Sequence, residues 1–240
     1  MSTNPAATAA TPDVGILGTG RMGVRIAAML AEAGRQVVLG SRDPARSARI
    51  VATLDIPGLQ AGSYADALRA ATLLPAVFIR DGLFDLLDAH RAELDARVLI
   101  DISNPFNADY SDFLTGWDTS GAEELQKRFP GARVIGAFKN IYWEVFDQPL
   151  FDGTPSDILV VGDDAPAKQA FMALVAGTPF RYLDAGPLRN ARTVERMTLL
   201  AQRLGRPLGA GPRIGWRFLG ERWTPGSHDR RGIDALIARG

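Results

Sequence analysis

The stretch Val14-Gly15-Ile16-Leu17-Gly18-Thr19-Gly20-Arg21-Met22-Gly23 decides the fold class of this 240-residue chain. Its apolar run ends in Gly-x-Gly-x-x-Gly, and the residues that follow show the apolar spacing of a helix. This order predicts a strand, a tight turn and a helix whose first amides are free to bind a phosphate, although a purely structural glycine turn is the alternative. Gly18 permits the turn, Gly20 lets a pyrophosphate approach the backbone, and Gly23 lets the helix pack on the strand. The predicted dinucleotide-binding residues of the turn are Gly18, Thr19, Gly20, Arg21, Met22 and Gly23.

The composition is that of an ordinary soluble globular protein, with 46% hydrophobic and 22% charged residues. The formal net charge is zero and no long basic run occurs, so nothing favours nucleic acid or an anionic membrane as a partner. Because the chain has no cysteine, disulfides, thiolate catalysis and cysteine-ligated metals are excluded. The two histidines, His90 and His228, lie far apart in the sequence, so no metal site is expected.

The first dozen residues, Met1 to Pro12, are rich in Ala, Thr, Asn and Pro and lack the basic start and apolar segment of a signal peptide. We therefore expect residues 1–12 to form a disordered tail. No stretch of the sequence approaches the ~20 apolar residues of a membrane span. The expectation is a cytoplasmic protein.

A second strand follows the first predicted helix. We expect this helix from about Gly20 to Ala33, a stop at Gly34 and a buried strand at 36–40, which together form a right-handed parallel βαβ unit. Strand-like and helix-like runs then alternate, which predicts an α/β fold with a Rossmann-type doubly wound parallel sheet. The later strands are expected at 59–61, 72–79, 98–102, 133–138, 157–162 and 180–184, and the later helices at 44–54, 64–70, 81–92, 120–129, 164–176 and 187–204.

This pattern predicts that the chain beyond the tail is divided into three parts. Residues 13–150 are expected to form the dinucleotide-binding Rossmann domain, and residues 151–205 a smaller C-terminal α/β part that closes the cleft. Residues 206–240 form a C-terminal arm, where the composition changes to Gly, Pro, Arg and Trp. The aromatic residues of this arm indicate that it packs on its own domain or on a partner subunit.

The end of the second strand is the place where such folds choose between cofactors. Ser41 and Arg42 occupy it, and Arg46 lies one helical turn beyond Arg42. A hydroxyl group with two guanidinium groups suits the extra phosphate of NADP. In the alternative interpretation Asp43 caps the next helix, Pro44 is its first residue and the arginines are solvated; both can hold together.

Two later loops are candidates for the opposite end of the cofactor. The strand at 98–102 opens into Ser103-Asn104-Pro105, at the carboxyl edge where open α/β folds bind ligands, although a plain asparagine–proline turn is the alternative. The loop Lys139–Phe146 carries several aromatic residues. They either form a wall against a planar ligand or cover the core.

In the order and spacing of these predicted elements and motifs, the chain resembles the NADPH-dependent coenzyme F420 reductase family, whose relatives include the reductase domains of metalloreductases. Four stretches carry the resemblance, and together they span roughly residues 13 to 204. They are Gly15 to Gly23, Gly40-Ser41-Arg42-Asp43-Pro44, Asp101-Ile102-Ser103-Asn104-Pro105, and the run from Val160-Val161-Gly162-Asp163-Asp164 to Asp184-Ala185-Gly186-Pro187-Leu188.

The resemblance implies the way in which the cofactor is bound. NADPH lies on the glycine turn, its extra phosphate meets Ser41 and Arg42, and its nicotinamide reaches the ends of the later strands. A hydride then passes to a ring stacked over the nicotinamide, which is a deazaflavin in the type members. The resemblance also implies a homodimer. The residues expected near the nicotinamide are Ile79, Arg80, Asn104 and Pro105.

Two departures from the family pattern fall where the acceptor should bind. This chain has Ile79-Arg80 in place of a Val-Pro pair, and Lys139-Asn140 in place of Asn-Thr. A lysine and an arginine in the cleft would suit an anionic or carbonyl acceptor, so we predict catalytic roles for Lys139 and Asn140, with Lys139 as a proton donor. Alternatively, both basic groups lie at the rim of the cleft as phosphate or solvent contacts.

Two functions are consistent with these observations. The first is an NADPH-dependent oxidoreductase that transfers a hydride to a small-molecule acceptor, either deazaflavin or flavin (coenzyme F420 or a flavin as co-substrate) or a small carbonyl or imine compound. The second is an NADP(H)-binding sensor or partner subunit without turnover.

Overall fold

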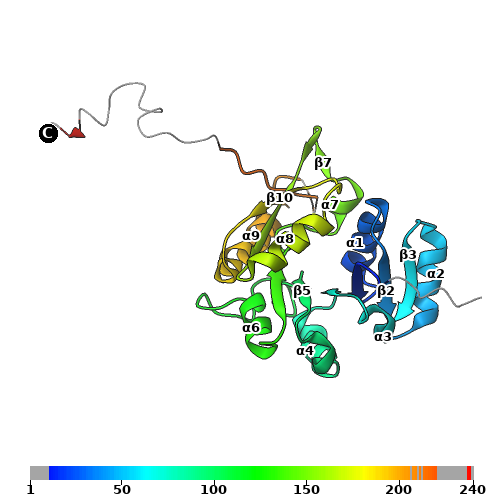
Figure 1. Cartoon of the computed structure of the whole chain (residues 1–240). Coiled ribbons are helices and arrows are strands. Elements are labelled where there is room, and N and C mark those ends of the chain that lie inside the picture. Colours follow the sequence, from blue (N-terminus) through cyan, green and yellow to red (C-terminus); the bar gives the residue numbers. More distant parts are fainter. Residues whose placement is uncertain (1–10, 206, 210, 212, 221–236, 239–240) are drawn as a thin grey trace, which may run out of the picture.

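The computed structural model describes residues 11–205, 207–209, 211, 213–220 and 237–238 of the chain (Figure 1). The tail predicted at 1–12 therefore lies outside the described residues except for Thr11 and Pro12, and so does most of the arm beyond residue 220.

An eight-stranded sheet forms the centre of the molecule, in the order β10-β9-β6-β5-β4-β1-β2-β3. Neighbouring strands are parallel except for the pair β6 and β9, which is antiparallel. The strands of the sheet are β1 (Val14–Leu17), β2 (Val37–Ser41), β3 (Leu59–Ser63), β4 (Thr72–Pro75), β5 (Val98–Asp101), β6 (Arg133–Gly136), β9 (Asp157–Gly162) and β10 (Arg181–Asp184).

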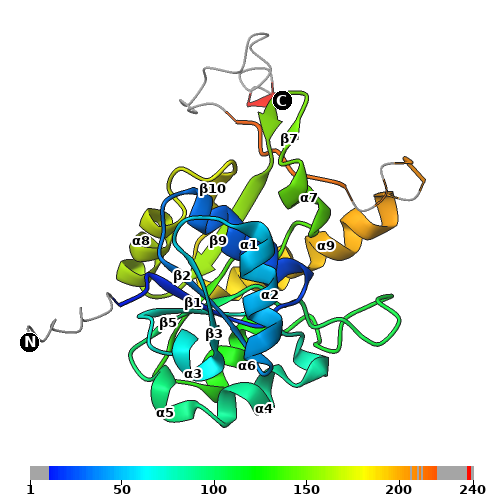
Figure 2. The same ribbon diagram turned by 90° about the vertical axis from the view of Figure 1, so that its right-hand side faces the viewer.

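Helices cover both faces of this sheet, as Figures 1 and 2 show. One apolar cluster joins α1 and α8 to the first face, and a second cluster joins α3, α4 and α6 to the other. Neighbouring residues of one strand, Ile16 and Leu17, point into different clusters, which explains the continuous apolar run of β1. The helices are α1 (Arg21–Glu32), α2 (Pro44–Leu54), α3 (Tyr64–Ala67), α4 (Leu83–Asp88), α5 (Arg91–Leu94), α6 (Gly121–Arg128), α7 (Glu144–Asp147), α8 (Ala165–Leu174) and α9 (Ala191–Gly205), with 3-10 turns at Ile79–Asp81 and Leu188–Asn190.

This arrangement confirms the predicted Rossmann-type α/β fold, and most of the predicted elements lie within two residues of their expected bounds. The largest corrections concern a strand and a helix in the middle of the chain. The strand expected at 72–79 ends at Pro75, which pairs with Leu17, and the chain then turns. The helix expected at 81–92 is divided into α4 and α5, because His90 leaves helical geometry between them.

The C-terminal strands extend the Rossmann sheet. β9 runs antiparallel to β6, so the connection between them, residues 137–156, begins and ends at the carboxyl edge of the sheet. This connection contains α7 and the hairpin of β7 (Leu150–Phe151) and β8 (Thr154–Pro155), which the sequence did not indicate. It therefore lies at the same edge as the end of β1.

Residues 213–220 of the C-terminal arm pack on β9 and on the hairpin, at one end of the molecule (Figure 2). Asp157, only 1% exposed, anchors them: its carboxylate accepts hydrogen bonds from the amide of Phe218 at 2.6 Å and from Arg181 at 2.6 Å, and Arg217 lies 3.4 Å away. Burial opposes this charge, but these partners outweigh it and lower the pKa of Asp157. Residues 213–220 of the arm therefore pack on their own chain.

Replacing Asp157 by asparagine is expected to release this part of the arm. The amide loses the charge-assisted bonds to Arg181 and Phe218, at a cost of about 1–3 kcal/mol. Limited digestion with trypsin should then cleave after Arg217 severalfold faster than in the wild type, as mass spectrometry would show. Asp152→Asn, an exposed change in the hairpin, is the control; equal cleavage rates in both variants would contradict the anchor.

No helix within the described ranges is long and apolar enough to cross a membrane.

Candidate functional site

The glycine turn between β1 and α1 has the geometry of a phosphate cradle. Gly18 has φ +127°, and a Cβ on Gly23 would lie 2.3 Å from the carbonyl oxygen of Gly18, so both positions require glycine. A Cβ on Gly20 would meet only the carbonyl oxygen of Ala76, at 3.8 Å, which leaves open space above this residue. The backbone of the turn is therefore accessible to a ligand.

The first amides of α1 are free to bind an anion. Gly20 is the N-cap and supplies no side-chain bond, and the first amide to bond back to the turn is that of Val24, to Gly20. Among the described residues the amides of Arg21, Met22 and Gly23 have no acceptor. Free amides and the helix dipole together suit the pyrophosphate of a dinucleotide, so the turn fits the predicted cofactor.

The residues predicted to select NADP surround the end of β2. Ser41 is 6% exposed and its hydroxyl accepts the amide of Asp43 at 3.1 Å, so its proton is free to be donated. Arg42 is exposed, and Arg46 donates to the hydroxyl of Thr19 at 2.9 Å. This bond connects the phosphate clamp, formed by Ser41, Arg42 and Arg46, to the glycine turn. The alternative interpretation holds as well, because Asp43 caps α2 through the amide of Ala45.

Tyr64 is a neighbour of this clamp that the sequence did not reveal. It follows β3 directly, and β3 pairs with β2 so that Ser63 lies opposite Ser41. Burial raises the pKa of Tyr64, and the guanidinium of Arg42 acts on it in the opposite direction. The only signal in the sequence was that both residues follow the ends of adjacent parallel strands.

The four residues predicted near the nicotinamide lie together at the ends of β4 and β5. A Cβ on Gly121 would lie 3.0 Å from Ile79 Cδ1 and 3.4 Å from Pro105 Cδ, so these two side chains meet at the start of α6. Arg80 donates to the carbonyl oxygen of Asn107, three residues beyond Asn104. Tertiary structure thus brings Ile79, Arg80, Asn104 and Pro105 together, and Ala76, the residue that follows β4, lies directly beneath the glycine turn.

Arg80 lies in an aromatic surrounding. Its guanidinium carbon is 4.0 Å from the ring centroid of Tyr110 and 5.1 Å from that of Phe78. Phe78 is 36% exposed and Tyr110 39% exposed, so both rings face partly outward beside the cation. Such a surface can receive a flat ring and an anionic group.

Asn104 presents a free acceptor. Its amide nitrogen donates to the carbonyl oxygen of Lys139 at 2.8 Å and lies 3.3 Å from the hydroxyl of Thr198. Its Oδ1 is buried and has no hydrogen-bond partner among the described residues. A buried acceptor of this kind is costly unless a ligand or water satisfies it, so Asn104 fits a site that binds a donor group.

Lys139 lies in a buried ion cluster, not in the cleft. Its side chain is 0% exposed, and its ammonium is 2.6 Å from Asp101 Oδ2 and 3.0 Å from Glu195 Oε1 and also donates to the carbonyl oxygen of Ser103. Burial disfavours the charge, but the two carboxylates outweigh it and raise the pKa of Lys139. Burial also raises the pKa of Glu195, which Lys139 lowers to a smaller extent. The proton-donor role and the alternative rim contact both need an accessible ammonium, so this placement corrects both expectations.

Asn140 is likewise 0% exposed. Its side chain donates to the carbonyl oxygen of Asp157 at 2.7 Å and accepts the amide of Leu159 at 3.2 Å. These bonds join the loop after β6 to the antiparallel strand β9. The catalytic role predicted for Asn140 is therefore not supported by its position, which is that of a strand-joining residue.

The aromatic loop after β6 packs in part in the core and in part against α1. Phe138 and Phe146 pack in the core, with ring centroids 5.8 Å apart. Trp143 instead lies against α1, with the guanidinium carbons of Arg21 and Arg25 at 4.8 and 4.6 Å from its ring centroid. It therefore forms a side wall next to the glycine turn.

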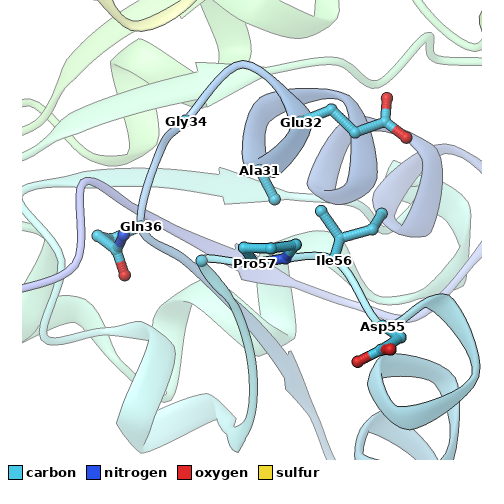
Figure 3. A pocket seen from close by; sticks show the side chains of 8 residues that line it. Ala31, Glu32, Gly34, Gln36, Asp55, Ile56 and Pro57 are labelled. Carbon is cyan, nitrogen blue, oxygen red and sulfur yellow. The ribbon is translucent and has the colours of Figure 1, made fainter.

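A hollow of about 520 Å³ lies at the opposite edge of the sheet, where β2 and β3 begin (Figure 3). Its lining includes Glu32, Asp55, Ile56 and Pro57 (Figure 3). The ends of β1, β4 and β5 face away from it, so this hollow is separate from the predicted cofactor site.

Comparison with known proteins finds similarity to NADP oxidoreductases. The family model described as "NADP oxidoreductase coenzyme F420-dependent" matches residues 13–105. The rat protein Metalloreductase STEAP3 is 31% identical over 189 residues, which cover 78% of this chain and 36% of that protein. The F420-dependent NADP reductase of Methanothermobacter thermautotrophicus is 28% identical over 213 residues, which cover 82% of this chain and 91% of that protein. This chain thus spans about a third of the metalloreductase and most of the Methanothermobacter reductase.

Solved structures share the fold. A crystal structure of an Arthrobacter sp. FB24 protein, named for the same F420-dependent NADP reductase activity, has a TM-score of 0.76 at 24% identity and covers 87% of this chain and 100% of that one. The imine reductase of Myxococcus stipitatus in complex with NADP⁺ has a TM-score of 0.58 at 21% identity and covers 83% and 63%. The chain is thus similar to coenzyme F420-dependent NADP oxidoreductases, through a family model over its first part and through reductase relatives over most of its length, and it shares the Rossmann fold of these proteins.

Proposed function

We propose that this enzyme transfers a hydride between NADP(H) and an acceptor that binds over the nicotinamide. The observation that carries the proposal is the single sheet edge at which the free amides of α1, the clamp around Arg42 and the residues after β4 and β5 meet. The names of its relatives, F420-dependent NADP reductases, support the same reaction class.

Three groups of residues bind three different parts of the cofactor. The amides of Arg21, Met22 and Gly23 hold the pyrophosphate, and Ser41 with the two arginines of the clamp holds the extra phosphate. The groups after β4 and β5 hold the nicotinamide end. Bound NADPH supplies the hydride itself, so these residues act by binding and orientation and not by acid–base chemistry.

The acceptor that the site favours is a flat ring of the deazaflavin or flavin type. With Lys139 buried, Arg80 is the basic group that remains of the two departures from the family pattern, and it is flanked by the partly exposed rings of Phe78 and Tyr110. Aromatic rings and a guanidinium group stack well on a conjugated ring. A small carbonyl or imine compound is the second acceptor class, supported by the fold shared with imine reductases.

The acceptor is tested by following NADPH oxidation at 340 nm with a deazaflavin, FMN, riboflavin and a set of small carbonyl and imine compounds. We expect turnover with a deazaflavin or flavin to exceed that with small carbonyls by at least about tenfold, because only the flat rings bury the aromatic surface. NADH should be the poorer donor. No oxidation with any acceptor, despite tight NADPH binding, would contradict the proposal.

A homodimer is part of the proposal. Leu200 and Leu204 are 48% and 43% exposed on the same side of α9, one helical turn apart, and form an apolar stripe that a second copy could cover. Light scattering should give about twice the mass of the 25.8 kDa chain, and Leu204→Lys should shift the equilibrium toward the monomer. A monomeric wild type at micromolar concentration would contradict it. The cytoplasmic location stays a prediction.

A further inference from the structure

Three segments of the chain meet at the ammonium group of Lys139. Asp101 comes from the end of β5, Ser103 from the loop that follows it, and Glu195 from α9. The ammonium group donates hydrogen bonds to Ser103 and Glu195, and Asp101 Oδ2 lies 2.6 Å away as its ion-pair partner. Because the ammonium group is fully buried among these groups, Lys139 offers no donor to a substrate, although it lies directly behind the loop that carries Asn104.

The carboxylates of this cluster have further partners that fix their positions. Asp101 Oδ1 accepts the amide and the hydroxyl of Ser103, at 2.9 and 2.7 Å. Glu195 accepts the first two amides of α6, those of Gly121 and Ala122, at 3.0 and 3.2 Å. The positive end of the α6 dipole helps to stabilise the second carboxylate. The cluster therefore joins β5, α6 and α9 at one point.

The carbonyl oxygen of Lys139 holds the Asn104 side chain. It accepts the amide nitrogen of Asn104 at 2.8 Å and the hydroxyl of Thr198. Because this bond fixes the nitrogen of the amide, the oxygen of the same amide is turned to the other side, where it has no partner among the described residues. Lys139 thus determines which way the free acceptor of Asn104 points.

We propose that Lys139 is a positioning residue, which orients the Asn104 amide so that its free oxygen accepts a hydrogen bond from the carboxamide NH₂ of the NADP(H) nicotinamide. The proposal rests on the function proposed above. Asn104 then touches the cofactor, and Lys139 acts only through it, with its ammonium anchored behind the loop and its carbonyl oxygen in front.

The test compares two cofactors that differ in this one donor. The 3-acetylpyridine analogue of NADP⁺ carries a methyl group in place of the carboxamide NH₂. Wild-type protein should bind NADP⁺ about tenfold more tightly than the analogue in a fluorescence or calorimetric titration, since one hydrogen bond to a buried acceptor is lost. In Lys139→Met this preference should fall to about twofold, while the preference for NADP⁺ over NAD⁺, set at the distant clamp, should remain.

Two further variants keep the test independent of folding. Thr198→Val removes one bond to the Lys139 carbonyl at nearly constant volume and should lower the preference partly. Asn104→Ala should abolish it. Lys168→Met removes another paired lysine, on α8, and should leave both preferences unchanged.

The outcomes distinguish the role of Asn104, the role of Lys139 and the binding of NADP(H) itself. Full preference for NADP⁺ over the analogue in Asn104→Ala would overturn the acceptor role of Asn104. Full preference in both Lys139→Met and Thr198→Val, with loss only in Asn104→Ala, would overturn the positioning role of Lys139. If the wild type bound neither NADP⁺ nor NADPH, the proposed function would fail, and this inference with it.

Discussion

Lys139→Met should lower the free energy of unfolding by about 3–5 kcal/mol at pH 8, because it leaves two buried carboxylates without their counter-charge. Asp101 and Glu195 are both about 1% exposed in their side chains, so neither can recover its hydration without opening the fold. Methionine replaces the aliphatic stem of lysine closely in length, so the loss reflects the missing charge and not a cavity. Thermal or urea unfolding followed by circular dichroism measures it.

The loss should depend on pH, with a definite sign. Burial already raises the pKa of Glu195 above its ordinary value of 4.5, and removal of the ammonium raises it further. The folded variant then binds a proton that the unfolded chain releases, so its free energy of unfolding falls as the pH rises through the folded-state pKa. At pH 5.5 the destabilisation should therefore be about 1–2 kcal/mol smaller than at pH 8, since one pKa unit corresponds to about 1.4 kcal/mol.

The control for this prediction is Lys168→Met, whose ammonium pairs with the half-exposed Asp184. A pair of this kind contributes about 0–1 kcal/mol, so the control should change little at either pH. If Lys139→Met lost the same amount at both pH values, or no more than Lys168→Met, the buried ion cluster would not have the energetic role assigned to it.

Arg42→Ala should weaken NADPH binding about tenfold to a hundredfold, because an arginine–phosphate interaction contributes about 1.5–3 kcal/mol. Arg42 is exposed and forms no ion pair with any of the described residues, so its guanidinium is available to a phosphate. NADH has no phosphate at this position and should bind with its affinity changed by no more than about twofold. Titrations with both cofactors give the two dissociation constants.

Arg49→Ala is the matched control, an exposed arginine on α2, the helix that follows Arg42, and it lies 3.8 Å from Asp43. It should affect NADPH and NADH alike, and only slightly. Arg46→Ala should give an intermediate loss, since Arg46 also donates to Thr19. Equal losses of NADPH and NADH affinity in Arg42→Ala would remove Arg42 from the phosphate clamp.

The parts of the site that could be predicted depend on residues close together in the chain. The glycine turn needs only the six positions from Gly18 to Gly23, because φ and backbone contact are local properties. The helix start at Asp43-Pro44 is equally local, and the structure places both where the pattern indicated. The carboxyl edge of β5 followed from the parallel fold, which directs the ends of β1, β4 and β5 to one side.

The position of Lys139, in the loop after β6, could not be predicted from residues close to it in the chain. A charged residue in a loop is ordinarily solvated, so the sequence predicted Lys139 in the cleft or at its rim. Its partners come from β5 and from α9, and no spacing in the sequence connects them. The same is true of Tyr64 beside Arg42, and of β9, whose antiparallel direction follows from a connection that stays at one edge of the sheet.

The sequence by itself determined the Rossmann fold and the glycine turn, and it predicted the residues that would bind the NADP phosphate, because glycine geometry, helix capping and strand periodicity act over a few residues. The tertiary structure alone decided that Lys139 is buried in an ion cluster, that the Asn104 side-chain oxygen has no partner among the described residues and that Arg80 lies beside the aromatic rings. The physical reason is burial, since whether a charge faces solvent, a ligand or another charge depends on segments far apart in the chain that meet only when the sheet is complete.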